Sequence, residues 1–108
     1  MNSFSVWIID PYVKAVGIVK LSRNYILQDM YRLIGCSMVD AGRYPGLVGD
    51  DMLYFDEEAL LKGVFTPMFR FGGYPLVGRA LVIGTDCLGN EKSPETRVSR
   101  LIEMVAWL

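Results

Sequence analysis

The sequence contains no histidine, the side chain that most often acts as general base and as metal ligand. This absence excludes every Ser–His or Cys–His nucleophile arrangement. The two cysteines, Cys36 and Cys87, lie far apart and form no C-x-x-C motif, so we expect reduced structural thiols. We therefore predict a protein that is not an enzyme and that has no cofactor and no metal site.

Long apolar runs and basic runs are also missing. Asp10, Lys14 and Lys20 interrupt the N-terminal apolar stretch, so no segment reaches the roughly 18 residues of a membrane span. The chain has 11 Lys and Arg against 12 Asp and Glu, a net charge of −1. Neither a membrane nor duplex nucleic acid is therefore an expected partner. Because the first residues lack the charged region of a signal peptide, we expect a cytoplasmic protein.

Apolar side chains, in contrast, are abundant. They make up 52% of the 108 residues, above the usual range of about 45–50%. This is more apolar surface than one small core needs, and it can be buried in a subunit interface or in an aromatic ligand site. We favour the interface and expect a homo-oligomer.

The N-terminal third predicts a β-hairpin followed by a helix. Residues 4–9 and 15–21 are rich in β-branched and aromatic side chains, and a loop with Tyr12 and Lys14 separates them. Asn24 can cap the helix and Gly35 can end it. A single apolar stripe is expected from Leu27, Met30, Tyr31 and Ile34.

The middle of the chain predicts two paired strands, a short helix and an irregular segment. The strands are residues 37–44 and 52–55, joined by a loop rich in glycine and proline. Asp56 is expected to cap the short helix, which runs to Lys62 and ends at Gly63. Residues 64–75 are the least regular region, and their aromatic side chains must pack on the core, a partner subunit or a ligand.

The C-terminal third predicts a central strand, a tight turn and a closing helix. Residues 80–83 form an apolar run between glycines, and residues 85–90 contain Asp, Gly and Asn, which tolerate left-handed backbone angles. Ser93 is expected to cap the helix, with Pro94 at its first position. Its buried stripe would be Val98, Leu101, Ile102 and Val105.

Together these elements predict one α+β domain over residues 1–108. The sheet would be mainly antiparallel with about four to six strands, accompanied by two main helices and one short helix.

Arginines beside aromatic residues in loops are the candidate ligand-binding residues. The planar fork of arginine grips phosphate, and aromatic faces stack on bases. The alternative is that these arginines are solvated or pair with Asp40, Asp56 and Glu57. The candidates are Tyr12, Arg43, Tyr44, Phe69, Arg70, Phe71 and Arg79.

Two further motifs have structural explanations. The acidic clusters at residues 50–51 and 56–58 fit turn and helix-cap chemistry. Gly72-Gly73 followed by Gly78 lacks the spacing of a phosphate loop, so we attribute these glycines to close backbone packing.

Four short sequence blocks follow one another along the chain, and their order is more informative than any one of them. They are Ile9-Asp10-Pro11, Leu33-Ile34-Gly35, the aromatic and acidic block 55–58 with Gly63, and the segment 77–84. In this order they resemble a family of small uncharacterised phage and plasmid proteins that is known only as a domain of unknown function. The resemblance implies a viral or mobile-element origin and names no chemistry.

Three functions from different classes follow. The first, which we favour, is a non-catalytic protein that sequesters a small anionic nucleotide, for instance a phage sponge for a host immune cyclic dinucleotide. The second is a phage or plasmid accessory protein that inhibits a host protein by direct contact through its aromatic segment. The third is a metal-dependent enzyme that degrades a nucleotide with acidic residues.

Overall fold

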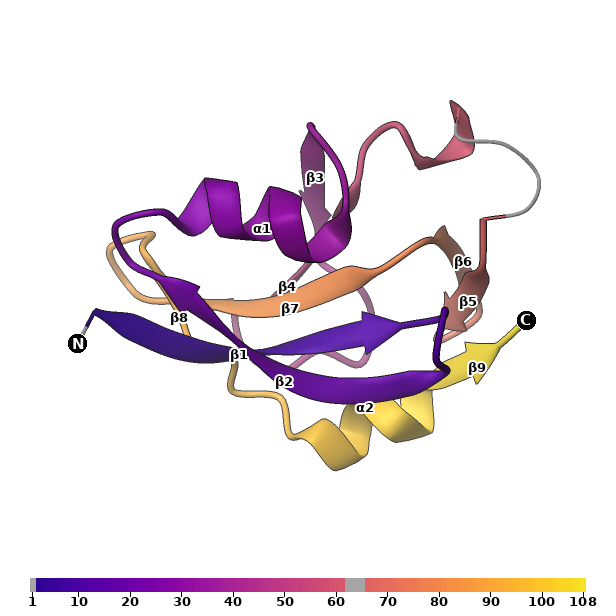
Figure 1. Cartoon of the computed structure of the whole chain (residues 1–108). Helices are drawn as coiled ribbons and strands as arrows, with labels where there is room; N and C mark the ends of the chain where they lie inside the picture. Colours follow the sequence, from indigo (N-terminus) through magenta and orange to yellow (C-terminus); the bar gives the residue numbers. More distant parts are fainter. Residues whose placement is uncertain (1, 62–65) are drawn as a thin grey trace.

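The computed structural model describes residues 2–61 and 66–108, whose strands form two antiparallel sheets (Figure 1). The predicted α+β fold, with a mainly antiparallel sheet, two main helices and one short helix, is confirmed. The elements in chain order are β1 (Ser3–Asp10), β2 (Ala15–Ser22), α1 (Ile26–Ile34), β3 (Val39–Gly42), β4 (Met52–Asp56), the 3₁₀ helix η1 (Ala59–Leu61), β5 (Met68–Phe71), β6 (Tyr74–Val77), β7 (Ala80–Thr85), β8 (Glu91–Lys92), α2 (Val98–Met104) and β9 (Val105–Trp107).

The larger sheet has β7 at its centre. Its strand order is β2-β1-β7-β4-β3, and β8 pairs with the end of β7. Val82 lies opposite Trp7 on one side and opposite Leu53 on the other. All of Ala80–Ile83 is fully buried, which confirms the predicted central strand.

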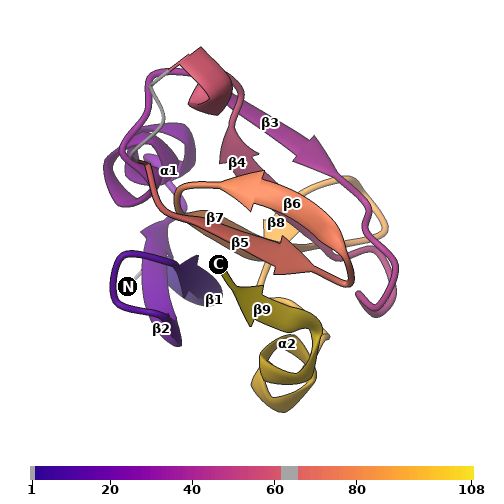
Figure 2. The same ribbon diagram turned by 90° about the vertical axis from the view of Figure 1, so that its right-hand side faces the viewer.

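Both faces of this sheet are covered, and the side chains of β7 alternate between them. Leu81 and Ile83 pack with Met30 of α1, whereas Val82 packs with Leu101 of α2 and with the second sheet. Figures 1 and 2 show α1 on one side of the large sheet and α2 on the other. Burial on both faces explains why β7 is apolar throughout instead of alternating with polar residues.

The second sheet has the order β6-β5-β9, and its strands β5 and β6 lie largely where an irregular segment was predicted. Gly72 (φ 55°) and Gly73 (φ 90°) form a two-residue turn between β5 and β6. Positive φ at both positions is typical of the type I′ turn that matches strand twist. The prediction of irregular structure was therefore wrong for residues 68–75, while residues 64 and 65 lie outside the described part.

The closing helix is shorter than predicted, and Ser93 and Pro94 precede it. Its N-cap is Arg97, which makes no side-chain capping bond. The chain bends at Glu95 and Thr96 before the helix, where the Asp51 carboxylate accepts the N–H groups of both residues, at 3.0 and 2.7 Å.

The predicted buried stripe of this helix is also wrong in part. Leu101 is buried, but Ile102 is 60% exposed. At Val105 the chain becomes strand β9, which pairs with β5.

The first helix begins at Ile26, with Tyr25 as its N-cap and no side-chain cap, so the expected Asn24 cap is wrong. Instead, Asp29 in the first turn accepts the N–H of Ser22 at 2.8 Å. Gly35 ends the helix in the left-handed conformation, as predicted. Leu27 is exposed, because the apolar face is formed by Ile26, Met30, Leu33 and Ile34.

The other short elements agree with the sequence in part. The paired strands β3 and β4 are confirmed, although β3 covers only Val39–Gly42. The short helix is one turn of 3₁₀ helix, and the Asp56 carboxylate accepts the N–H of Glu58 before it, at 2.9 Å. Lys62 and Gly63 lie outside the described residues. Within those residues no helix is long and apolar enough to cross a membrane.

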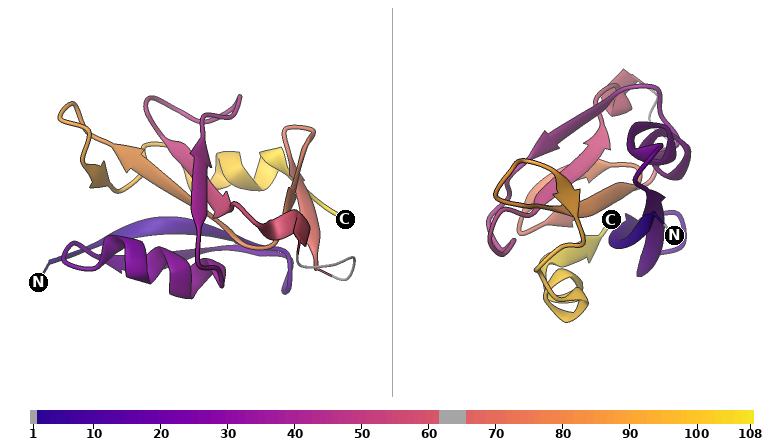
Figure 3. Two further views of the ribbon diagram at one scale, coloured as in Figure 1. Left: turned by 90° about the horizontal axis from the view of Figure 1, so that it is seen from above. Right: turned by 90° about the vertical axis from the view of Figure 1, so that its left-hand side faces the viewer.

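The turns that contain Gly46 and Gly72 both lie against Met104, the last residue of α2. A Cβ atom at Gly46 or Gly72 would lie 2.5 or 2.7 Å from the Cε methyl of Met104. The N–H of Gly72 also donates to the carbonyl of Met104 at 2.9 Å. Met104 thus joins the loop before β4 to the hairpin of the second sheet, and the left view of Figure 3 shows this hairpin next to the end of the C-terminal helix.

Candidate ligand-binding site

Two of the candidate residues, Tyr12 and Arg79, contact each other. The Arg79 guanidinium carbon lies 4.3 Å from the centre of the Tyr12 ring, and Nε donates to Asp10 Oδ2 at 3.1 Å. Tyr12 belongs to the turn between β1 and β2, and Arg79 directly precedes β7. Asp10 balances the charge of Arg79, so this cluster links the β1–β2 turn to the residue before β7. It is poorly suited to binding an anion.

Arg43 is also paired, in this case with Asp50. The two side chains form an ion pair across the loop between β3 and β4, and each is 62% exposed. Neither Asp10 nor Asp50 was among the acidic partners expected from the sequence. An exposed pair of this kind contributes about 0–1 kcal/mol to stability.

Phe69 and Phe71 are core residues, which corrects the expectation that they face a ligand. Both side chains are fully buried. Phe69 contacts Trp107 with ring centres 6.3 Å apart, and Phe71 contacts Tyr44 at 6.4 Å. Alternation along β5 turns both rings to the interior, so neither is available to stack on a base.

Arg70, between these two phenylalanines, points to the outside. It is exposed on β5, and no ion pair links it to another described residue. It lies opposite Pro75 of β6 in the strand register. Of the three candidate arginines, Arg70 is the one that the described chain does not neutralise.

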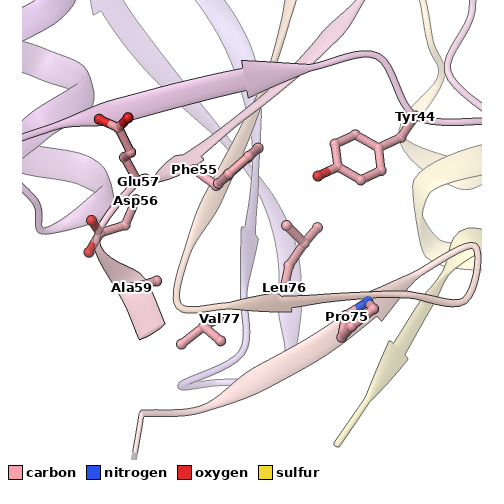
Figure 4. A pocket seen from close by; sticks show the side chains of 8 residues that line it. All are labelled: Tyr44, Phe55, Asp56, Glu57, Ala59, Pro75, Leu76 and Val77. Atoms are coloured by element: carbon pink, nitrogen blue, oxygen red, sulfur yellow. The ribbon is translucent and has the colours of Figure 1, made fainter. Parts of the chain in front are cut away.

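Tyr44 lines a hollow of about 200 Å³ beside Pro75 (Figure 4). The hollow lies between β6 and the end of β4, and the segment after β3 brings Tyr44 to it. Figure 4 shows Tyr44 at one end and two acidic side chains at the other. The lining residues are Tyr44, Phe55, Asp56, Glu57, Ala59, Pro75, Leu76 and Val77.

Aromatic contacts fix the Tyr44 ring. It meets Phe55 and Tyr74 edge to face, with ring centres 6.3 and 5.7 Å apart. It also lies over Gly42, where an added Cβ atom would be 3.1 Å from the ring carbon Cε1. The glycine therefore leaves room for the ring to fold back over the end of β3.

The electrostatics of the hollow are acidic. Burial, and secondarily the charge of Asp40, raise the pKa of the Tyr44 hydroxyl above its usual value, so it remains a proton donor at neutral pH. Asp56 is buried and Glu57 is exposed. Because none of the described lining residues carries a positive charge, the hollow suits N–H donors better than a phosphate.

No group of three or more potential metal ligands occurs in the described part of the chain.

The comparisons with known proteins give a family. The family model DUF3846, described as a domain of unknown function, matches residues 3–106. The chain belongs to this family. The search of curated proteins found no match, and neither did the search of solved structures.

All residues of the Tyr44 hollow lie inside the part of the chain that matches DUF3846. The sequence pointed to Tyr44 but indicated turn and helix-cap chemistry for Asp56 and Glu57, and the Asp56 carboxylate does accept the N–H of Glu58 in the turn before η1. Phe55 and the β6 residues were missed, because the sequence shows no local sign that these strands meet. The Gly72-Gly73 pair between two apolar runs was the available sign of the hairpin.

Proposed function

We propose that this protein is a non-catalytic binding protein that holds the base of a nucleotide in the Tyr44 hollow. The observation that carries the proposal is an aromatic hollow with carboxylates at one end and an exposed, unneutralised arginine on the adjoining strand pair. This arrangement separates the recognition of a base from the recognition of a phosphate.

The size and chemistry of the hollow suit one nucleobase. Its volume of about 200 Å³ is below the 300–1,000 Å³ typical of drug-sized ligands, so it accommodates a single ring system. Phe55, Pro75 and Leu76 supply apolar walls. Guanine is the preferred base, because its two adjacent N–H donors match the two oxygens of a carboxylate such as Glu57.

The phosphate would bind outside the hollow, at Arg70. Residues directly opposite in a strand pair share a face of the sheet, with Cβ atoms about 4.5–5.5 Å apart. Arg70 is therefore one strand away from Pro75, which forms part of the wall. A phosphate there would avoid the carboxylates at the far end of the hollow.

The sharper form of the proposal is a phage or plasmid protein that sequesters a cyclic dinucleotide of host immunity. Such a ligand has two bases, and one hollow of this size takes one of them. A homo-oligomer would supply the second hollow, which agrees with the apolar surplus of the composition. Stoichiometric capture requires tight binding and leaves the ligand chemically unchanged.

Thermal denaturation against a panel of nucleosides, linear nucleotides and cyclic dinucleotides tests this proposal. A ligand present at 100 times its Kd adds about 2.7 kcal/mol to stability, which raises the Tm by several degrees. We expect guanine-containing ligands to give the largest shift and to be recovered intact by mass spectrometry. A flat panel would refute nucleotide binding, and a chemically altered ligand would refute the non-catalytic role.

A further inference from the structure

Strand β2 forms an open edge of the large sheet. In the strand order, β2 (Ala15–Ser22) stands at one end, and among the described residues it pairs only with β1. Figures 1 and 2 show its outer side uncovered by another strand. An edge of eight residues presents a row of N–H and C=O groups that can pair with an added strand.

An apolar groove of about 260 Å³ runs beside this edge, between β2 and the segment formed by α2 and β9. Its lining residues are Lys14, Ala15, Val16, Ile102, Val105 and Trp107. Ile18 lies two residues beyond Val16, on the same face of β2. The side chains of Ile18 and Ile102 are 63% and 60% exposed. Two β-branched side chains so exposed on facing elements favour a partner that covers both.

The charges around the groove indicate the chemistry of that partner. Among the described lining residues Lys14 carries the charge, and the exposed Lys20 comes two residues after Ile18 on the same face of β2. Along this face, the two apolar side chains of Val16 and Ile18 therefore lie between the two cationic side chains of Lys14 and Lys20. The nearest charged residues of α2, Arg100 and Glu103, pair with each other at 3.9 Å and line a different hollow.

A second copy of the chain matches this pattern less well than an acidic partner. Antiparallel pairing of two β2 strands about Ile18 brings Lys20 of one copy near Lys14 of the other, which lies in the turn just before β2. Lysines on an edge strand commonly prevent such self-association. An acidic strand with alternating apolar residues meets both lysines with opposite charge.

We propose that this groove binds an extended acidic segment of a partner protein, which adds a strand to the edge of β2. Backbone pairing with β2 supplies affinity, and the alternating side chains supply selectivity. The segment places apolar residues on Ile18 and Ile102 and acidic residues on Lys14 and Lys20. This site is separate from the Tyr44 hollow and does not depend on nucleotide binding.

Two synthetic peptides with blocked ends test the proposal, Asp-Thr-Val-Thr-Val-Thr-Asp and its counterpart with Lys in place of Asp. Binding is followed by calorimetry and by tryptophan fluorescence, since Trp107 lines the groove. We expect the acidic peptide to bind about tenfold more tightly at low salt, and Lys20→Glu to remove or reverse this preference. Methylation of alternate backbone nitrogens of the peptide should abolish binding in one of the two registers.

Matched substitutions distinguish binding in the groove from non-specific binding elsewhere on the surface. Ile18→Asp should abolish binding of the acidic peptide, whereas Leu88→Asp, at an 82% exposed position in the turn after β7, should not change it. Circular dichroism checks that both variants are folded. Equal binding of the two peptides, no binding of the acidic peptide, or a dimer of the chain that Ile18→Asp dissociates would each overturn the proposal.

Discussion

The carboxylate of Asp51 accepts two hydrogen bonds from Thr96, one from the backbone N–H at 2.7 Å and one from the hydroxyl at 2.6 Å. Asp51 is only 1% exposed. The carbonyl of Thr96 accepts the indole N–H of Trp7 at 2.7 Å, and its hydroxyl accepts the N–H of Val48 at 2.8 Å. This network joins β1, the start of β4 and the segment before α2, and so it positions the helix that borders the apolar groove.

Loss of the Asp51 carboxylate should strongly destabilise the protein. Asp51→Ala leaves buried N–H and hydroxyl donors without an acceptor, and we expect a cost of about 2–4 kcal/mol in the free energy of unfolding. The exposed neighbour Asp50 is the matched control, and Asp50→Ala should cost no more than about 1 kcal/mol. Urea denaturation of both variants measures the difference, and equal costs would contradict the assigned role of Asp51.

The β5–β6 turn should tolerate Gly73→Ala better than Gly72→Ala. Both glycines have positive φ, so each alanine costs about 1–2 kcal/mol of backbone strain. At Gly72 the added Cβ also meets the Cε methyl of Met104 at 2.7 Å, whereas at Gly73 the space is open. Denaturant midpoints should therefore fall further for Gly72→Ala. The reverse order would show that the Met104 side chain moves aside at little cost.

Arg79 should matter for stability and not for ligand binding. Arg79→Ala removes the ion pair with Asp10 and the stacking on Tyr12, and we expect a loss of about 1–2 kcal/mol. The affinity for any nucleotide found in the panel should remain the same, since this cluster does not line the hollow. A loss of affinity in a variant that remains folded would restore Arg79 to the binding site.

The folded state should become less stable above about pH 10. Burial first and Asp40 second raise the pKa of Tyr44 above 10.0, and burial with Glu91 does the same for Tyr54. The unfolded chain therefore loses these protons at a lower pH than the folded chain. This contribution to stability is complete below the unfolded pKa and is lost as the pH rises through the folded pKa.

Tyr44→Phe tests this assignment. The variant should show a smaller fall in unfolding free energy between about pH 8 and pH 11 than the wild type, with Tyr54 accounting for part of what remains. Urea denaturation at the two pH values provides the comparison. An identical fall in both proteins would mean that Tyr44 titrates alike in the folded and unfolded chains.

The elements that the sequence predicted well are those whose signals are local. Gly35 ends α1 because a left-handed residue is needed there, and the apolar run at β7 needs cover on both faces. The hairpin at Gly72-Gly73 was missed although its turn signal is local, because the Gly and Pro residues of this segment were interpreted as those of an irregular loop.

Other features depend on contacts that are distant in sequence. Val105 continues the apolar pattern of α2 but joins a strand, since pairing with β5 outweighs helix propensity. The Tyr44 hollow also depends on contacts between residues that are distant in sequence. Phe55 and Leu76 meet only because β4 and β6 come together in the fold, so no spacing in the sequence could identify them as neighbours of Tyr44.

The most direct test of nucleotide binding is calorimetric titration of guanosine and guanosine monophosphate into the wild type, Glu57→Gln, Arg70→Gln and the control Arg32→Gln. We predict that Glu57→Gln weakens the binding of both ligands and that Arg70→Gln weakens the binding of only the monophosphate, by about fivefold. Arg32→Gln, on the surface of α1, should bind both as the wild type does. Binding that is unchanged in Glu57→Gln and Arg70→Gln, or absent from the wild type, would contradict the assignment of the Tyr44 hollow as a nucleotide site.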